Sequence, residues 1–81
     1  MKEITDIHIG QFIKEVVVQK GVKVPWIAQQ LGCHRNNVYL IFSRQWIDTG
    51  TLMKLSIILQ YDFFAELSGW LRDGDFGSDF V

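Results

Sequence analysis

The sequence has little of what marks several broad classes of protein. Cys33 is the only cysteine among its 81 residues, so no disulfide can form within the chain, and a reducing cytoplasm is the expected location. No apolar run approaches the roughly 18 residues of a membrane span, and residues 1–10 lack the apolar core of a signal peptide. Charged residues make up only 21%, and the 48% of hydrophobic residues argues against disorder. We therefore expect one small intracellular domain, near the lower size limit for an independent core.

Motifs for catalysis and metal binding are also missing. The sequence contains no Gly-rich phosphate loop and no nucleophile elbow, and its carboxylates are scattered. Cys33, His34 and His8 show neither a C-x-x-C nor an H-x-x-x-H spacing, so Cys33 is expected to be a small buried apolar residue. The sequence predicts no enzyme, and neither a cofactor nor a metal.

Charge is low in total but unevenly placed. The net charge is -1, which by itself does not indicate a nucleic-acid partner. Residues through Gln60 carry seven basic and four acidic side chains, or +3, whereas the remainder carries one basic and five acidic side chains, or -4. A mildly basic body with an acidic end is compatible with a polyanionic partner.

The spacing of hydrophobic residues predicts an all-α domain. Ile9, Ile13, Val16 and Val17 recur at i, i+4, i+7 and i+8, which is one face of an amphipathic helix. No Asn-Gly or Asp-Gly turn separates alternating strand-like segments. Five helices are expected: one capped by Asp6 and ended by Gly21, one from Pro25 to Gly32, one from about Arg35, one from Asp48 or Thr49, and one capped by Asp62 and ended by Gly69.

The chain is expected to divide into a folded part, residues 1–72, and an acidic tail with Gly and Phe residues, 73–81. A further possibility is that Gly74 and Gly77 begin a linker in a longer protein. Five aromatic residues are assigned to the core: Phe12, Trp26, Phe42, Phe63 and Phe64.

Trp70 and Leu71 are expected to lie beyond the fifth helix, where little interior is left to fill. They suggest a homodimer contact, because exposed apolar groups usually meet a partner. The alternative is a tail that folds back on the domain, with Phe76 and Phe80 among its apolar residues.

The stretch Ile27–Phe42 carries the features of two helices that cross closely. Ala28 is small enough for the point of closest approach, Gly32 can take a positive φ in the turn, and Val38 can face back from the second helix. This is the spacing of a helix-turn-helix, whose second helix enters the DNA major groove. The alternative is an αα-hairpin without a role in DNA binding.

Ala28, Gly32 and Val38, together with the pattern from Ile27 to Leu59 followed by Tyr61-Asp62-Phe63-Phe64, resemble the λ repressor/Cro (XRE-type) family of bacterial and phage transcriptional regulators. The resemblance implies a five-helix fold, sequence-specific DNA binding and, frequently, a dimer on a two-fold operator.

One departure concerns the end of the third helix. Members commonly carry Glu at the position of Phe42 and Gly near Arg44, where this chain has FSRQWID. Trp46 and Ile47 are expected to anchor that loop to the core.

If the second helix enters the major groove, the polar residues after Gly32 are placed to contact base edges. They are His34, Arg35, Asn36 and Asn37. Arg35 can pair with guanine, and Asn36 or Asn37 with adenine, each through two hydrogen bonds. Helical spacing places Asn36, Tyr39 and Ser43 opposite Val38, with Leu40 beside them for a thymine methyl group. Arg44 and Lys54 suit phosphates. The predicted DNA-binding residues are Arg35, Asn36, Asn37, Tyr39, Leu40, Ser43 and Arg44.

Other readings of these residues stay open. One of Arg35, Asn36 and Asn37 could serve only as the helix N-cap, and Tyr39 could be a half-buried surface aromatic. For the chain as a whole, the alternative to a DNA-binding regulator is a protein-interaction module, antitoxin- or adaptor-like, that binds through its C-terminal aromatic segment. A small-molecule ligand is not expected.

Overall fold

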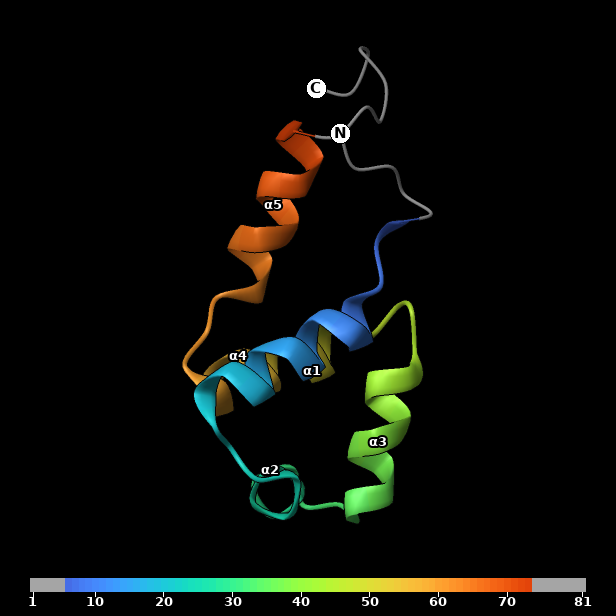
Figure 1. Cartoon of the computed structure of the whole chain (residues 1–81), viewed down its shortest axis with the longest axis vertical. Helices are drawn as coiled ribbons and strands as arrows, with labels where there is room; N and C mark the ends of the chain where they lie inside the picture. The colour runs from blue at the N-terminus through green and yellow to red at the C-terminus, as the bar shows by residue number, and fades with distance from the viewer. Residues whose placement is uncertain (1–5, 74–81) are drawn as a thin grey trace.

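The computed structural model describes residues 6–73, and within this range it contains helices and no strand (Figure 1). The prediction of an all-α chain is therefore confirmed. Of the expected tail, only Asp73 belongs to the described residues, and Phe76 and Phe80 lie outside them. The helices are α1 Ile9–Lys20, α2 Val24–Leu31, α3 Arg35–Ser43, α4 Thr49–Leu59 and α5 Phe63–Asp73.

Most helix limits follow the local signals in the sequence. Gly21 and Gly32 end α1 and α2 with φ values of 67° and 72°, which a residue without a Cβ adopts at no steric cost. The Asp48 carboxylate caps α4 by accepting the Thr51 N–H at 2.9 Å. This hydrogen bond, with a second one from the Thr51 hydroxyl, holds the pKa of Asp48 below its ordinary value. Asp62 accepts the Ala65 N–H at 3.0 Å, as expected for the start of α5.

Two predicted helix limits are wrong. Asp6 does not cap α1, because the helix begins only at Ile9 and the residue before it, His8, accepts the Gln11 N–H at 3.0 Å through Nδ1. Gly69 does not end α5, which continues to Asp73. A glycine inside a helix costs only about 1 kcal/mol relative to alanine, and the packing of the next residue, Trp70, against Phe12 can offset this cost. Trp70 and Leu71 therefore belong to α5 and do not follow it.

The core is formed mainly by the inner faces of α1 to α4. The predicted stripe of α1 is buried along its whole length, and Ile13 is fully inaccessible. Ile27 and Ala28 of α2 and Val38 of α3 are buried, and these two helices are in contact. The other buried hydrophobic residues are Ile7, Ile41, Phe42, Leu52, Leu55, Leu59 and Phe63.

Trp26 and Trp46 do not occupy the interior positions expected of them. Trp26 is 43% exposed, because Ile27 and its neighbour Ala28 take the inner face of α2. Trp46 is 51% exposed, so it does not anchor the loop after α3, where the half-buried Ile47 packs against the core.

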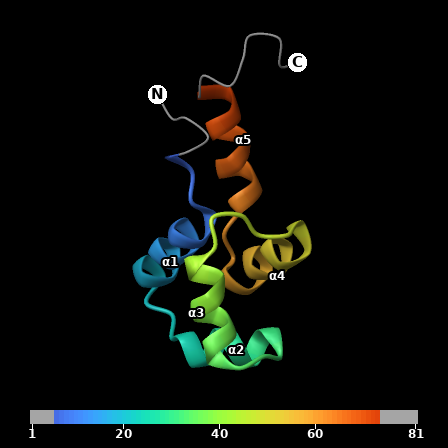
Figure 2. The same cartoon turned by 90° about the vertical axis from the view of Figure 1, so that its right-hand side faces the viewer.

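The two views of the fold agree on how the helices are arranged. α2 is seen nearly end-on in Figure 1 and lies across the foot of α3 in Figure 2, so these two helices cross steeply. α5 extends away from the other helices in both views. α3 lies at one edge of the molecule in Figure 1, so one of its long sides is on the outside.

Candidate nucleic-acid interface

The turn between α2 and α3 fixes how α3 is presented. Gly32 takes the left-handed conformation, which lets the Cys33 N–H donate back to the Ala28 carbonyl at 3.0 Å. Ala28 is 4% exposed and Val38 is inaccessible, so both belong to the buried core, and α2 and α3 are in contact. The inner side of α3 is therefore held closely against α2.

All the residues predicted to contact DNA are exposed in the structure. The inner side of α3 is made by Val38, Ile41 and Phe42, so the remaining positions of the helix face outward. Tyr39 and Leu40 are each 53% exposed, so the outer side of α3 also presents two large side chains to solvent. We call the outward-facing set the α3 face: Arg35, Asn36, Asn37, Tyr39, Leu40, Ser43 and Arg44.

The N-cap of α3 is His34, which none of the readings from the sequence had assigned to this role. Its Nδ1 accepts the Asn36 N–H at 3.2 Å, and its carbonyl accepts the Asn37 N–H at 2.9 Å. The capping of α3 therefore does not use the side chains of Arg35, Asn36 or Asn37. It also means that two backbone N–H groups of the first turn already have acceptors within the chain.

The members of the α3 face are not equivalent. Asn36, Leu40 and Ser43 recur at i, i+4 and i+7 and form the middle of the outer side. The Ser43 hydroxyl donates to the Leu40 carbonyl at 2.6 Å, which leaves the hydroxyl oxygen as an acceptor. The Tyr39 ring contacts Phe42 edge to face, with ring centroids 6.3 Å apart, so Tyr39 borders this row.

Arg44 differs from the others because it follows the last residue of α3 and has an extended backbone. Its side chain is exposed, and its carbonyl accepts a hydrogen bond from α1. A cation at the C-terminal end of a helix is also favoured by the helix dipole.

The attachment of α3 to α1 was not among the contacts predicted from the sequence. The N–H groups of Ile9 and Gly10 donate to the carbonyls of Gln45 and Arg44 at 2.9 and 3.0 Å. The Gln45 side-chain amide returns to the Ile7 carbonyl at 2.9 Å. We call this set of contacts the α1–α3 joint. It satisfies carbonyls just beyond the C-terminal end of α3 with N–H groups from the start of α1, two places where helices lack internal partners.

Gly10 makes the joint possible. A Cβ at this position would lie 2.5 Å from the Arg44 carbonyl oxygen and 2.6 Å from that of Phe42, and it would also clash with the Ile41 carbonyl. Real Cβ atoms are essentially never found so close to other atoms. A glycine in the first turn of an otherwise regular amphipathic helix was the only sign of this contact in the sequence.

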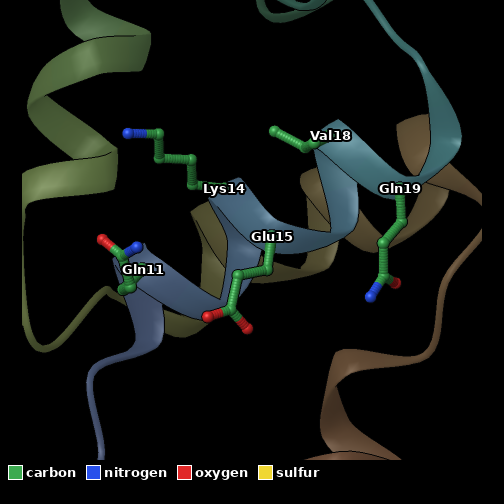
Figure 3. Close-up of a pocket in the computed structure, with 5 residues that line it drawn as sticks. All are labelled: Gln11, Lys14, Glu15, Val18 and Gln19. Atoms are coloured by element: carbon green, nitrogen blue, oxygen red, sulfur yellow. The ribbon is translucent and has the colours of Figure 1, made fainter.

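A lysine on α1 adds positive charge next to α3. Figure 3 shows a shallow hollow along the outer side of α1, with the Lys14 side chain directed toward α3. Glu15 and Gln19 point to the other side of the helix in the same view. The hollow is lined by side chains of α1 alone.

The remaining predictions for this region concern other kinds of site. In residues 6–73, no three His, Cys, Asp or Glu side chains come close enough together to hold a metal ion. No helix in the same range has both the length and the hydropathy needed to cross a membrane.

Trp70 and Leu71, which were predicted as a dimer contact, differ in exposure. Trp70 is half-buried, and its ring centroid lies 5.1 Å from that of Phe12, whereas Leu71 is 45% exposed.

No model of a protein family matches the chain, and comparison with curated proteins and with solved structures gave no significant match either. Only the residues of this chain therefore bear on what it does.

Proposed function

We propose that the chain is a sequence-specific DNA-binding regulator of the λ repressor/Cro-like kind, in which α2 and α3 form a helix-turn-helix and α3 is the recognition helix. The observation that carries the proposal is the α3 face. One helix is fastened on its inner side by Val38 and at its end by the α1–α3 joint, while its outer side presents polar and large apolar side chains to solvent. A rigid helix of this kind fits the major groove of B-DNA.

The proposed roles follow from the chemistry of base edges. Arg35 binds guanine O6 and N7, and Asn36 or Asn37 binds adenine N6 and N7. Leu40 contacts a thymine methyl group, and Tyr39 and Ser43 complete the reading surface. These side chains are exposed, and the cap of α3 is made by His34, which supports a role outside the fold.

Phosphate contacts are assigned to the cations around this surface. Arg44 follows α3, Lys54 is exposed on α4, and Lys14 points toward α3 from α1 (Figure 3). Such contacts set the position of the protein on the duplex without reading its sequence. They are positive charges around the α3 face of a chain whose net charge is -1.

Selection of bound sites from a pool of random duplex DNA tests the proposal. We expect a short enriched motif, and two half-sites about one helical turn apart if the chain binds as a dimer. Binding to the selected duplex should weaken at least tenfold between about 50 and 200 mM salt, because several phosphate contacts release counterions. No enrichment at low ionic strength would contradict the proposal.

A second candidate function is a protein-interaction module that uses α5. The extension of α5 away from the other helices and the exposed Leu71 favour it. Binding of a protein to an apolar surface responds little to salt, so the same titration separates the two functions.

A further inference from the structure

The two histidines of the chain occupy equivalent positions in the fold. His8 precedes α1 and His34 precedes α3, and each is the N-cap residue of its helix. In both cases Nδ1 accepts a backbone N–H of the first turn, that of Gln11 at 3.0 Å and that of Asn36 at 3.2 Å. The sequence contains no further histidine, so every histidine of this chain is a helix cap.

This kind of cap depends on the charge of the imidazole. A nitrogen that accepts a hydrogen bond carries no proton, so each cap needs a neutral ring with its proton on Nε2. Protonation turns Nδ1 into a donor and removes the acceptor. It also places a positive charge at a helix N-terminus, where the helix dipole disfavours a cation. Both effects of protonation therefore act against the cap.

The caps of the two following helices are of a different kind. The carboxylate of Asp48 accepts the Thr51 N–H at the start of α4, and that of Asp62 accepts the Ala65 N–H at the start of α5. A carboxylate loses its charge only near pH 4. The hydrogen bonds from Thr51 hold the pKa of Asp48 below its ordinary value. Mild acid therefore leaves these two caps in place.

The histidine caps lie at the two ends of the attachment of α3. His34 begins α3 itself. His8 directly precedes Ile9 and Gly10, whose N–H groups hold the far end of α3 in the α1–α3 joint. α3 thus depends on a neutral imidazole at its first turn and, through the start of α1, at its last turn.

We propose that mild acid loosens α3 while leaving α4 and α5 in place, because protonation of His34 and His8 removes the caps of α3 and α1. The range is about pH 8 to pH 5, in which histidine changes its charge. The folded state needs both rings neutral and so binds fewer protons than the unfolded chain. The free energy of unfolding is then full at the upper end of this range and falls as the pH decreases. This regulation goes beyond the proposed function and does not require DNA.

The charges around His34 are cations. Arg35 follows it on α3, and Lys14 of α1 is directed toward α3, whereas Glu15 points to the other side of α1 (Figure 3). α2, which also packs against α3, contains no charged residue. A protonated His34 therefore adds one more positive charge to positive surroundings.

The charges around His8 are mixed. Asp6 lies two positions before it, and Arg44 lies across the α1–α3 joint. On α5, the Glu66 carboxylate accepts the Tyr61 hydroxyl. We therefore expect acid to act more strongly on the cap of α3 than on that of α1.

A pH titration of the full chain without DNA, followed by NMR from about pH 8 to pH 5, tests the release of the caps. The backbone amide signals of Asn36 and Gln11 should shift in step with the imidazole signals of their own caps. The amide signals of Thr51 and Ala65 are internal controls and should stay in place, because their acceptors are carboxylates. Signals of Asn36 and Gln11 that do not follow their imidazoles would overturn the inference.

Urea denaturation at both ends of the pH range tests the consequence for stability. The midpoint of the wild type should fall by about 1 M for each cap lost. His34→Asn and His8→Asn keep an acceptor oxygen at the cap and take up no proton in this range. Each variant should lose part of the acid effect, the larger part in His34→Asn. The double variant should have the same midpoint at both pH values.

His34→Ala separates the loss of the cap from the gain of charge. Without an acceptor, its midpoint should be lowered already at pH 8, and acid should add only the share of His8. A midpoint of His34→Ala equal to that of the wild type at pH 8 would overturn the inference. So would an acid loss of wild-type size in the double Asn variant. None of these outcomes involves DNA, so a failure here and a failure of the proposed function can be told apart.

Discussion

α3 and α5 are both attached to α1, but by different kinds of contact. α3 is held at its end by backbone hydrogen bonds from Ile9 and Gly10, at a distance that only glycine permits. α5 is held by aromatic rings around Phe12, whose centroid lies 5.8 Å from Phe63 and 5.1 Å from Trp70. Hydrogen bonds are directional and tolerate little displacement, whereas apolar contact is non-directional. The helix proposed to read DNA is thus the more rigidly placed of the two.

The largest expected effect is at Gly10. Gly10→Ala should destabilise the protein by about 3 kcal/mol, the upper end for overpacking, because the obstructing atoms are backbone carbonyls that cannot rotate away. Urea denaturation measures this loss, which is a large fraction of the stability of a small domain. Gly69→Ala is the control: a Cβ there meets no atom within 4 Å, and the change should stabilise α5 by up to about 1 kcal/mol. Equal stability of Gly10→Ala and the wild type would show that the joint is not close-packed.

The attachment of α5 should respond to Phe12. Phe12→Leu removes the ring that Tyr61, Phe63 and Trp70 contact, and we expect a loss of about 1–2 kcal/mol, less than for a fully buried aromatic. Amide hydrogen exchange should accelerate in α5 and hardly change in α3. Equal acceleration in both helices would mean that the two attachments are not independent.

The Gln45 side chain should contribute less to the free energy of unfolding than Gly10 or Phe12 does. Gln45→Ala removes the hydrogen bond to the Ile7 carbonyl and should cost about 1 kcal/mol in urea denaturation. Exchange should accelerate at the C-terminal end of α3 and leave α5 unchanged, the reverse of the pattern for Phe12→Leu. The opposite pattern would contradict the division between the two attachments.

The smallest expected effect is a loss of stability at alkaline pH. It should affect the attachment of α5, near Tyr61, and not the α1–α3 joint. Burial, together with the hydrogen bond to Glu66, raises the pKa of Tyr61 above its ordinary value of 10.0, whereas the hydrogen bonds of the α1–α3 joint involve no ionisable side chain. A raised pKa in the folded state favours the protonated phenol, so its contribution is full below about pH 10 and is lost as the pH rises further. Thermal melting above about pH 10 should show this loss, and Tyr61→Phe should reduce it. An unchanged alkaline loss in Tyr61→Phe would assign it to another group.

Local features of the fold were predictable from the sequence, and contacts between distant segments were not. Gly21, Gly32 and Asp48 act through their own backbone or the next turn, so a short window contains the signal. The contact of Gly10 with Arg44 depends on a close approach across the chain, and no short window contains it. Gly69 was misread for the same reason, since the packing of Trp70 on Phe12 lies outside its neighbourhood.

In the candidate site, too, some features were predictable from the sequence and others were not. The exposed and buried sides of α3 follow from helical periodicity, and the expected residues are all exposed. The capping by His34 and the exposure of Trp46 were not predicted, because Asn is among the strongest N-cap residues and Trp is highly buried on average. That these residues contact DNA stays a prediction.

The most direct test of that prediction is the affinity of matched variants for the duplex obtained by selection. We predict that Arg35→Ala and Asn36→Ala each weaken binding by about 1–3 kcal/mol while the free energy of unfolding stays unchanged. Gln19→Ala, an exposed change on α1, should bind like the wild type. Wild-type affinity in both α3 variants, or a loss of binding only in proportion to lost stability, would contradict the assignment of α3 as the recognition helix.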